Sequence, residues 1–355
     1  MENRMESAKV INGYQVLRGF GCLGIMIAHS CHYVEVNFAN IESGDLLFPG
    51  RGGMLNYVCF FFVLSGFLTA RKIQGGGTVK CHILGRFWGI YPLYWLCLSI
   101  VILMRLGVYN CMDVSYDFWK SLLILPGNHT FPCNVEWTLQ FEITFYMLVV
   151  PFFTKWLRKA YPFFVAAMLG FIISCKVGWI TIGIPWLEYI IYGRDSLLWL
   201  FMGALMYYIL QFLNRKGSPN RVNSKIRWGI AVVLIVGITF ILDPKIYPVT
   251  TLGDYLWLIA LLFTSLWIFG NLKASDTNIL VLIGNHSYVI YLIHSTLFGV
   301  VFYLINKSGI DYNLAIHAII VVIALVLLIG LSTILKGSVK GMRQALTERK
   351  RMISR

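Results

Sequence analysis

The chain has 355 residues, of which 58% are hydrophobic and only 13% are charged, and its formal net charge is +14. Soluble domains carry charges on about a quarter of their residues, so this composition excludes a soluble globular enzyme, a disordered protein and a disulfide scaffold. A membrane-spanning helix needs about 20 apolar residues, and a chain of this length holds about ten of them. The sequence therefore predicts an all-α, polytopic transmembrane helix bundle.

Ten apolar segments follow one another along the chain. With both termini on the inner side, the inner loops hold 22 Lys and Arg residues and the outer loops hold five. This excess follows the positive-inside rule and predicts an N-in/C-in topology. Because topology accounts for the basic composition, we expect no nucleic-acid partner. The segments are 14–34, 55–70, 88–106, 137–154, 162–182, 192–212, 228–243, 254–270, 282–304 and 312–334.

The first segment carries two ionisable side chains, Arg18 and His29. Such groups are costly inside a membrane and mark candidate functional sites. Their spacing leaves them ~20° apart in rotation and ~16 Å apart along a helix. Both therefore point the same way, with Arg18 near the inner surface and His29 in the outer half. The alternative is a snorkelling arginine and a histidine hydrogen-bonded for packing.

The second segment carries the small pair Ser65 and Gly66 towards its inner end. Small residues let helix backbones approach closely, which makes packing one interpretation of the pair. The other interpretation is that Ser65 contacts a ligand.

A cationic vestibule is predicted at the inner side, between the second and third segments. Such a patch fits a phosphate-rich cytosolic ligand, although positive-inside topology also produces one. The glycines at 75–77 form a flexible loop and are only a weak signal for phosphate binding. The basic side chains of the vestibule are Arg71, Lys72, Lys80 and Arg86.

The fourth segment opens with a polar face. Thr138, Glu142 and Tyr146 recur every four residues and so share one side of a helix. Glu142 is expected at about the depth of His29, where a carboxylate would fix the imidazole tautomer for general-base catalysis. The alternative is a Glu142 that pairs with a structural arginine or a backbone group. Glu136 is expected at the surface, facing solvent.

The ninth segment carries a third polar stripe. Ser287, Tyr291 and His294 follow i, i+4, i+7 spacing and lie on one face. Ser287 could instead cap the helix, and Tyr288 or Tyr291 could anchor it at the interface. His294, near mid-depth, has no such alternative.

The eight cysteines of the chain show no C-x-x-C spacing, so buried hydrophobic positions are expected for most of them. Cys111 and Cys133 share a predicted outer loop. Whether they form a disulfide there depends on the redox environment and is left open.

In this order, the motifs resemble the acyltransferase-3 family of integral-membrane O-acyltransferases, of the bacterial polysaccharide O-acetyltransferase type and without a fused esterase-like domain. Each motif is short, but five of them in family order over nearly the whole chain make the resemblance specific. The matching residues are Arg18 and His29; Phe61, Phe62 and Ser65–Leu68; Arg86, Phe87 and Ile90–Tyr94; Trp137–Leu139, Glu142, Phe145 and Tyr146; and Ser287, Tyr288, Tyr291, Leu292 and His294.

The chain departs from the family pattern at two positions. Gln15 stands where the family often has an acid, and Gly89 stands where it usually has a second arginine. Both departures concern the details of donor binding more than the class of the protein.

The resemblance implies a multi-pass enzyme of the bacterial cytoplasmic (inner) membrane, surrounded by membrane lipids. It would move an acyl group, in the first instance acetyl, from cytosolic acyl-CoA to a hydroxyl of a glycan or glycolipid such as an exopolysaccharide, O-antigen or lipid-linked precursor. Acetyl-CoA is then the donor substrate, and no metal is expected. The acceptor, the oligomeric state (a homo-oligomer included) and a succinyl or other acyl donor are left open.

The expected roles follow from depth. Coenzyme A phosphates would stay at the inner cationic rim, while the thin pantetheine arm carries the thioester towards mid-depth. His29 would remove the acceptor's proton or carry the acyl group transiently, with Glu142 beside it. We expect Arg18, Ser65, Arg71, Lys72 and Arg86 to bind the donor, and Trp137, Thr138, Ser287, Tyr291 and His294 to bind the acceptor.

Residues 1–335 are expected to form the transmembrane domain and residues 336–355 a basic cytoplasmic tail. The main rival function is a proton-coupled transporter or flippase of a glycan or glycolipid, because intramembrane His and Glu also serve as proton relays. A transporter predicts inverted repeats with paired broken helices, and the sequence shows none.

Overall fold

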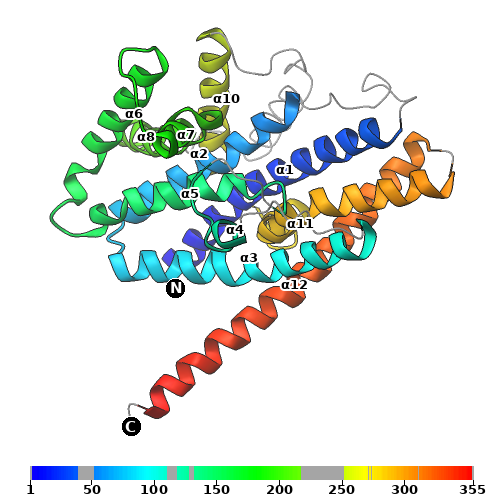
Figure 1. Ribbon diagram of the computed structural model, residues 1–355. Coiled ribbons are helices and arrows are strands. Elements are labelled where there is room, and N and C mark those ends of the chain that lie inside the picture. The colour runs from blue at the N-terminus through cyan, green and yellow to red at the C-terminus, as the bar shows by residue number, and fades with distance from the viewer. Residues whose placement is uncertain are drawn as a thin grey trace.

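The computed structural model describes residues 2–38, 52–109, 118–127, 132–216, 252–270, 272, 274–310 and 312–353. This part of the chain is helical and contains no strand, which confirms the predicted all-α class (Figure 1). The α-helices are α1 (Glu2–Asn37), α2 (Gly52–Gln74), α3 (Val79–Tyr109), α4 (Phe118–Leu123), α5 (Trp137–Leu148), α6 (Tyr161–Lys176), α7 (Pro185–Tyr192), α8 (Ser196–Lys216), α10 (Leu252–Gly270), α11 (Ile279–Ser308) and α12 (Leu314–Ile353). The 3₁₀ turns are η2 (Val150–Phe153), η3 (Arg158–Ala160) and η4 (Gly193–Asp195).

Five helical stretches within the described residues are long and apolar enough to cross a membrane, so the chain is a multi-pass membrane protein. The total of ten spans and their sidedness remain predictions. The predicted segment 228–243 and Cys111 lie outside the described residues. The five stretches are Val79–Val108, Arg158–Lys176, Ser196–Leu213, Ile279–Ser308 and Leu314–Glu348.

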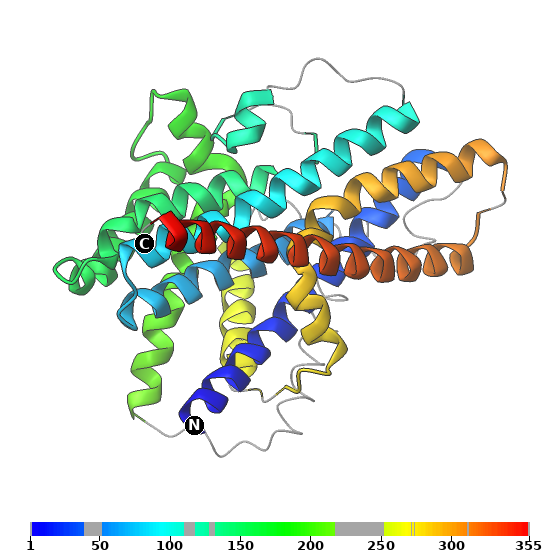
Figure 2. The ribbon, with the colours of Figure 1, turned by 90° about the horizontal axis from the view of Figure 1, so that it is seen from below.

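Two helices differ in length from the predicted segments. The segment expected at 137–154 contains α5, which has 12 residues and is ~18 Å long, and a 3₁₀ turn with Pro151 near its start. Proline lacks the N–H that a continuing helix would use. At the other extreme, α12 has 40 residues and continues without a break past position 335. Its C-terminal part extends away from the bundle in Figure 1 and lies in front of the bundle in Figure 2, which is seen from below.

The centre of the bundle is the pair α1 and α11, whose backbones touch at two glycines. A Cβ added at Gly284 would lie 1.9 Å from the Gln15 carbonyl oxygen, and one added at Gly19 would lie 2.1 Å from that of Leu280. Only glycine permits this approach, as in the small-residue contacts of other membrane helices. The two helices are therefore held in a fixed register.

A second close pair joins α2 and α8. A Cβ at Gly66 would lie 1.8 Å from the Leu200 carbonyl oxygen, and a Cβ at Gly203 would lie 2.0 Å from that of Val63. The packing interpretation is therefore correct for Gly66. Its neighbour Ser65 faces a cavity, as described below.

Polar contacts dock α12 against the pair α1 and α11 at two places, one near the start of α11 and one far along α1. Near the start of α11, His286 Nδ1 lies 2.9 Å from the Ser332 hydroxyl, and Lys336 donates to the Asn285 carbonyl. Far along α1, the buried Ser30 hydroxyl lies 3.0 Å from His317 Nε2. These contacts place α12 alongside α1 and α11.

Candidate active site

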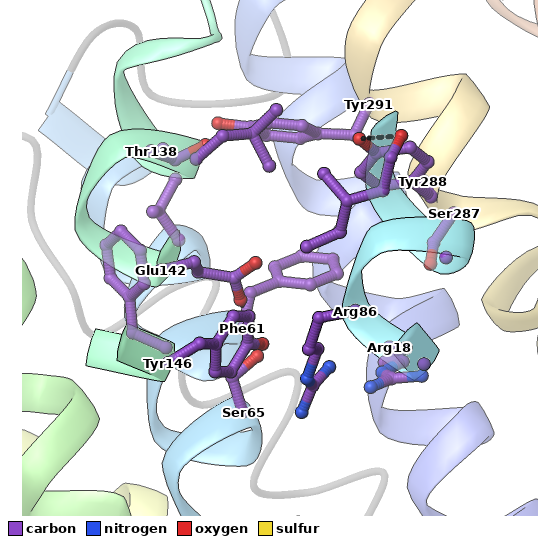
Figure 3. A pocket seen from close by; sticks show the side chains of 16 residues that line it. Arg18, Phe61, Ser65, Arg86, Thr138, Glu142, Tyr146, Ser287, Tyr288 and Tyr291 are labelled. Atoms are coloured by element: carbon purple, nitrogen blue, oxygen red, sulfur yellow. Dashed lines mark hydrogen bonds between the residues drawn. The ribbon is translucent and has the colours of Figure 1, made fainter. Parts of the chain in front are cut away.

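A cavity of about 230 Å³, here called the central cavity, lies between α1, α2, α3, α5 and α11 (Figure 3). Three of the predicted polar stripes contribute to its wall, although they come from helices far apart in the sequence. Its lining residues are Arg18, Val58, Phe61, Phe62, Ser65, Gly85, Arg86, Gly89, Ile90, Thr138, Leu139, Glu142, Tyr146, Ser287, Tyr288 and Tyr291.

A second cavity of about 570 Å³, here called the vestibule, adjoins the first. Arg18, Ser65 and Arg86 line both, so the two cavities meet at these side chains. The vestibule contains four cationic side chains and no carboxylate among its lining residues. The structure thus brings together the five residues expected to bind the donor. The lining residues are Tyr14, Gln15, Arg18, Ser65, Leu68, Arg71, Lys72, Gly75, Gly77 and Arg86.

Glu142 projects into the central cavity and accepts a hydrogen bond of 2.5 Å from the Ser65 hydroxyl (Figure 3). This geometry differs from the expectation that Glu142 lies beside His29. Glu142 lines the same cavity as Arg18, and His29 lies eleven residues, or ~16 Å, farther along α1. The structure thus places the carboxylate at the level of Arg18, a depth that the sequence spacing did not reveal.

Arg86 is oriented by two neighbours at the point where the cavities meet. Its Nη2 donates to the Thr69 hydroxyl over 3.2 Å, and its guanidinium carbon lies 3.8 Å above the Tyr146 ring. Cation–π contact with the ring face stabilises the charge where water is scarce. The polar stripe of α5 therefore contributes Glu142 to the cavity and Tyr146 as a platform for the arginine.

The glycines at 75–77 do not form a phosphate cradle. The backbone N–H groups of Gly75, Gly76 and Gly77 all donate to carbonyls of the last turn of α2. Gly76 has a φ of +85°, which suits the left-handed conformation that ends many helices. The loop therefore caps a helix C-terminus, whose dipole is unfavourable for anions, and binding of an anion falls to the cationic side chains.

The α11 stripe and the start of α5 meet above the carboxylate. Tyr291 donates to the Val135 carbonyl over 3.3 Å, and the Thr138 hydroxyl donates to the same carbonyl over 3.0 Å. Ser287 lines the cavity while donating to the Gly284 carbonyl. Trp137 is not a lining residue; its ring packs edge-on against Phe62, a residue that lines the cavity.

His29 and His294 form a separate pair farther along α1 and α11. Neither lines the two cavities. Their ring centroids are 4.9 Å apart, and His294 is in turn 5.8 Å from the ring of Tyr291, which does line the central cavity. Tyr291 and His294 thus connect the cavity to His29.

Several lining residues were not among the expected site residues, although Gln15, Gly89 and Tyr288 entered the comparison with the family pattern. Gln15 lies three residues before Arg18 on the same face of α1, a spacing that could have revealed it. Gly85 and Gly89 flank Arg86 on α3, and a Cβ at either would meet nothing within 4 Å. Tyr288, considered as an interfacial anchor and matched to a family motif, lines the central cavity and donates to a backbone carbonyl of α3.

Glu136 was expected at the surface, facing solvent, but it is fully buried. The Tyr94 hydroxyl donates to its Oε1 over 3.1 Å. A buried carboxyl group needs such a partner, and α3 supplies it from a position 42 residues earlier in the chain. No local sequence signal indicated this contact.

The fold and the site together define a helical membrane protein with a cationic vestibule, which meets a central cavity that contains the carboxylate of Glu142. The family model described as an acyltransferase domain, acyltransferase-3, matches residues 11–335. The chain therefore belongs to this acyltransferase family, and the resemblance seen in the motifs is confirmed.

One curated relative matches part of the chain. Nodulation protein 10 of Rhizobium leguminosarum bv. viciae is 23% identical over an alignment of 186 residues, with 45% of this chain and 49% of that protein covered. The chain thus spans about half the length of the curated relative it matches. No solved structure matches the chain.

Proposed function

We propose that this acyltransferase is an O-acetyltransferase that moves an acetyl group from cytosolic acetyl-CoA to a hydroxyl of a cell-surface glycan or its lipid-linked precursor. The observation that carries the proposal is the meeting of the two cavities at Arg18, Ser65 and Arg86. A donor with a charged end and a reactive end would occupy both cavities at once.

The vestibule fits the charged end of coenzyme A. Four cations without a neighbouring carboxylate in the lining repel one another unless an anion lies among them. Guanidinium groups bind phosphate oxygens in pairs, and lysine contributes a further point charge. Coenzyme A carries several phosphate charges, so Arg18, Arg71, Lys72 and Arg86 would hold them at this end.

The central cavity fits the reactive end. Its wall is largely apolar, with Val58, Phe61 and Phe62 from one helix, and only the slender pantetheine arm with a short acyl group would enter about 230 Å³. Glu142, bonded to Ser65, lies where it would accept a hydrogen bond from an incoming hydroxyl.

Two chemical routes would use His29, which His294 and Tyr291 connect to the central cavity. In the first, the acceptor oxygen attacks the thioester carbon, His29 takes the hydroxyl proton, and the C–S bond breaks to release coenzyme A, which regains the proton as a thiol. In the second, an imidazole nitrogen of His29 attacks the thioester carbon, the C–S bond breaks, and coenzyme A leaves as a thiol with the imidazole N–H proton; the acceptor hydroxyl then attacks the acyl carbon, the N–C bond breaks, and the hydroxyl proton returns to the imidazole. Membership of an acyltransferase family favours either route over the transporter alternative.

The test compares surface glycans from cells with the gene, without it, and with a His29→Ala variant, by mass spectrometry and NMR. We expect one O-acetyl group to disappear in the last two strains, with the variant protein still inserted at normal amounts. Loss of a general base lowers the rate by about 10²–10⁴, and loss of an acyl carrier lowers it further. An unchanged set of acyl groups in the strain without the gene would refute the proposal.

A further inference from the structure

A second imidazole lies against His29, and its surroundings fix which of its nitrogens is free. His294 has an exposed fraction of 0%. Its Nδ1 lies 3.0 Å from the Ile290 carbonyl oxygen, one turn earlier on α11. A carbonyl oxygen only accepts, so Nδ1 carries the hydrogen, and in the neutral ring Nε2 is left with a lone pair.

That Nε2 atom has no hydrogen-bond partner although it is buried. Most buried polar atoms in proteins are paired, and an exception calls for a physical reason. The neighbouring ring is that of His29, edge-on at 76° with a centroid separation of 4.9 Å. Two imidazoles joined by one N–H···N bond have ring centroids about 5 Å apart. A small rotation of either ring would therefore complete the bond.

The pairing is imposed by the backbones. The close contact of Gly19 with Leu280 is followed along the same two helices by the contact of Cys22 with the Ser287 carbonyl at 3.9 Å and then by the His29–His294 pair. Both helices therefore advance in the same direction, and from Cys22–Ser287 to His29–His294 each advances by seven residues. A register held by glycine contacts leaves His29 little freedom to move away from its partner.

The polar groups around the His29–His294 pair have other partners, so His294 is the hydrogen-bond acceptor for His29. From α1, His32 acts electrostatically on His29 and packs against Tyr33, and the Tyr33 hydroxyl pairs with Ser295 of α11. Tyr291 packs on the other side of His294. Among the described residues no carboxylate forms an ion pair with either imidazole, and Glu142 is bonded to Ser65.

We infer that His294 is the positioning residue for His29: its Nε2 accepts a hydrogen bond from one His29 nitrogen, so that the other nitrogen faces the substrate. This inference rests on the proposed acyl transfer at His29. In the first route, the hydroxyl proton moves to the outward nitrogen of His29 as the C–O bond forms and the C–S bond breaks. The resulting imidazolium then shares its positive charge with His294 through the N–H···N bond, and the proton leaves on the coenzyme A thiol.

The test uses the full-length protein in detergent or vesicles with acetyl-CoA and the acceptor found by the glycan analysis. His294→Leu removes the acceptor atom and keeps an apolar side chain of similar bulk, whereas His294→Gln supplies a new acceptor oxygen. His317→Leu is the matched control, because it removes another buried histidine that contacts Ser30 and Tyr312 instead of His29.

We expect kcat of His294→Leu to fall about 10²-fold, within the range for lost support of a catalytic imidazole, with the KM for acetyl-CoA within about twofold of wild type. His294→Gln should recover most of kcat and shift the acidic limb of the pH–rate profile, since only one imidazole of the pair still titrates. His317→Leu should leave that limb unchanged.

Equal kcat values and equal acidic limbs for His294→Leu and His317→Leu would overturn the inference. Should His294→Leu fail to fold, a wild-type profile for His294→Gln would do the same. A wild-type protein that transfers no acetyl group would instead refute the proposed function, and an active His29→Ala variant would refute the role of His29, so the three failures are distinguishable.

Discussion

At the scale of single residues, the site depends on how three charged side chains share one small volume. Arg18, Arg86 and Glu142 all line the central cavity, yet the hydrogen-bond partners seen for Glu142 and Arg86 are the hydroxyls of Ser65 and Thr69. A carboxylate held by a neutral donor keeps its remaining oxygen positions for a substrate. Two substitutions test this division.

Glu142→Gln keeps an oxygen that accepts from Ser65 but removes the charge. We expect the rate of acyl transfer to fall by about 10²–10⁴, as for loss of a group that takes part in proton transfer. Ser65→Ala keeps the charge of Glu142 but removes the hydroxyl that donates to it, and should cost about tenfold. Initial rates at saturating acetyl-CoA give the comparison. A wild-type rate in Glu142→Gln together with a reduced rate in Ser65→Ala would show that the hydrogen bond matters and the charge does not.

Arg86→Ala is expected to weaken donor binding more than turnover. The side chain lies where the two cavities meet and contacts Thr69 and Tyr146. Losing a guanidinium–phosphate contact should raise the apparent KM for acetyl-CoA by roughly tenfold or more, with a smaller effect on kcat. Lys120→Ala on α4, outside both cavities, serves as the control. An unchanged KM in Arg86→Ala would remove this residue from the donor site.

At the scale of helices, glycines set the distances between backbones. Gly66 and Gly203 bring α2 against α8, and Gly19 and Gly284 bring α1 against α11. Other glycines have no such role: a Cβ at Gly330 of α12 would meet nothing within 4 Å. The same substitution should therefore have opposite effects at different positions.

Gly66→Ala places a methyl group 1.8 Å from the Leu200 carbonyl oxygen, so α2 and α8 must separate. We expect a loss of about 1–3 kcal/mol or more in stability, as for other overpacked positions. Gly330→Ala should be neutral or slightly stabilising, because alanine is the better helix former. Melting temperatures in detergent make the comparison, and a stable Gly66→Ala variant would contradict the close α2–α8 contact.

At the scale of helices, the sequence predicted the faces of single helices but not the contacts between them. The stripes of Thr138 with Glu142 and of Ser287 with Tyr291 followed from helical spacing, and both face the central cavity. The depth of Glu142 relative to His29 did not follow, because it depends on how α5 packs against α1, which spacing within one helix does not record. Burial of Glu136 depends on Tyr94 of another helix. The sequence therefore predicted which residues share one face of a helix, but it did not predict how one helix packs against another.

At the scale of the whole molecule, the vestibule is built from parts of α1, α2 and α3, so a ligand bound there joins three helices. Coenzyme A should raise the melting temperature, since a ligand that binds the folded state alone stabilises it by about 2.7 kcal/mol at 100 times its Kd. Pantetheine, which lacks the phosphates, should do little, and high salt should weaken the coenzyme A effect. Equal shifts with both ligands would contradict a phosphate site among Arg71, Lys72 and Arg86.

The arrangement of Arg18 and Arg86 has a consequence for the membrane itself. A protein with connected internal chambers risks becoming a leak for the ions that energise a cell. Two permanent positive charges at the junction of the chambers repel protons and metal cations, as arginines do in water channels. The residues that would hold the donor would thus also act as an electrostatic seal, and the enzyme would remain insulating between turnovers.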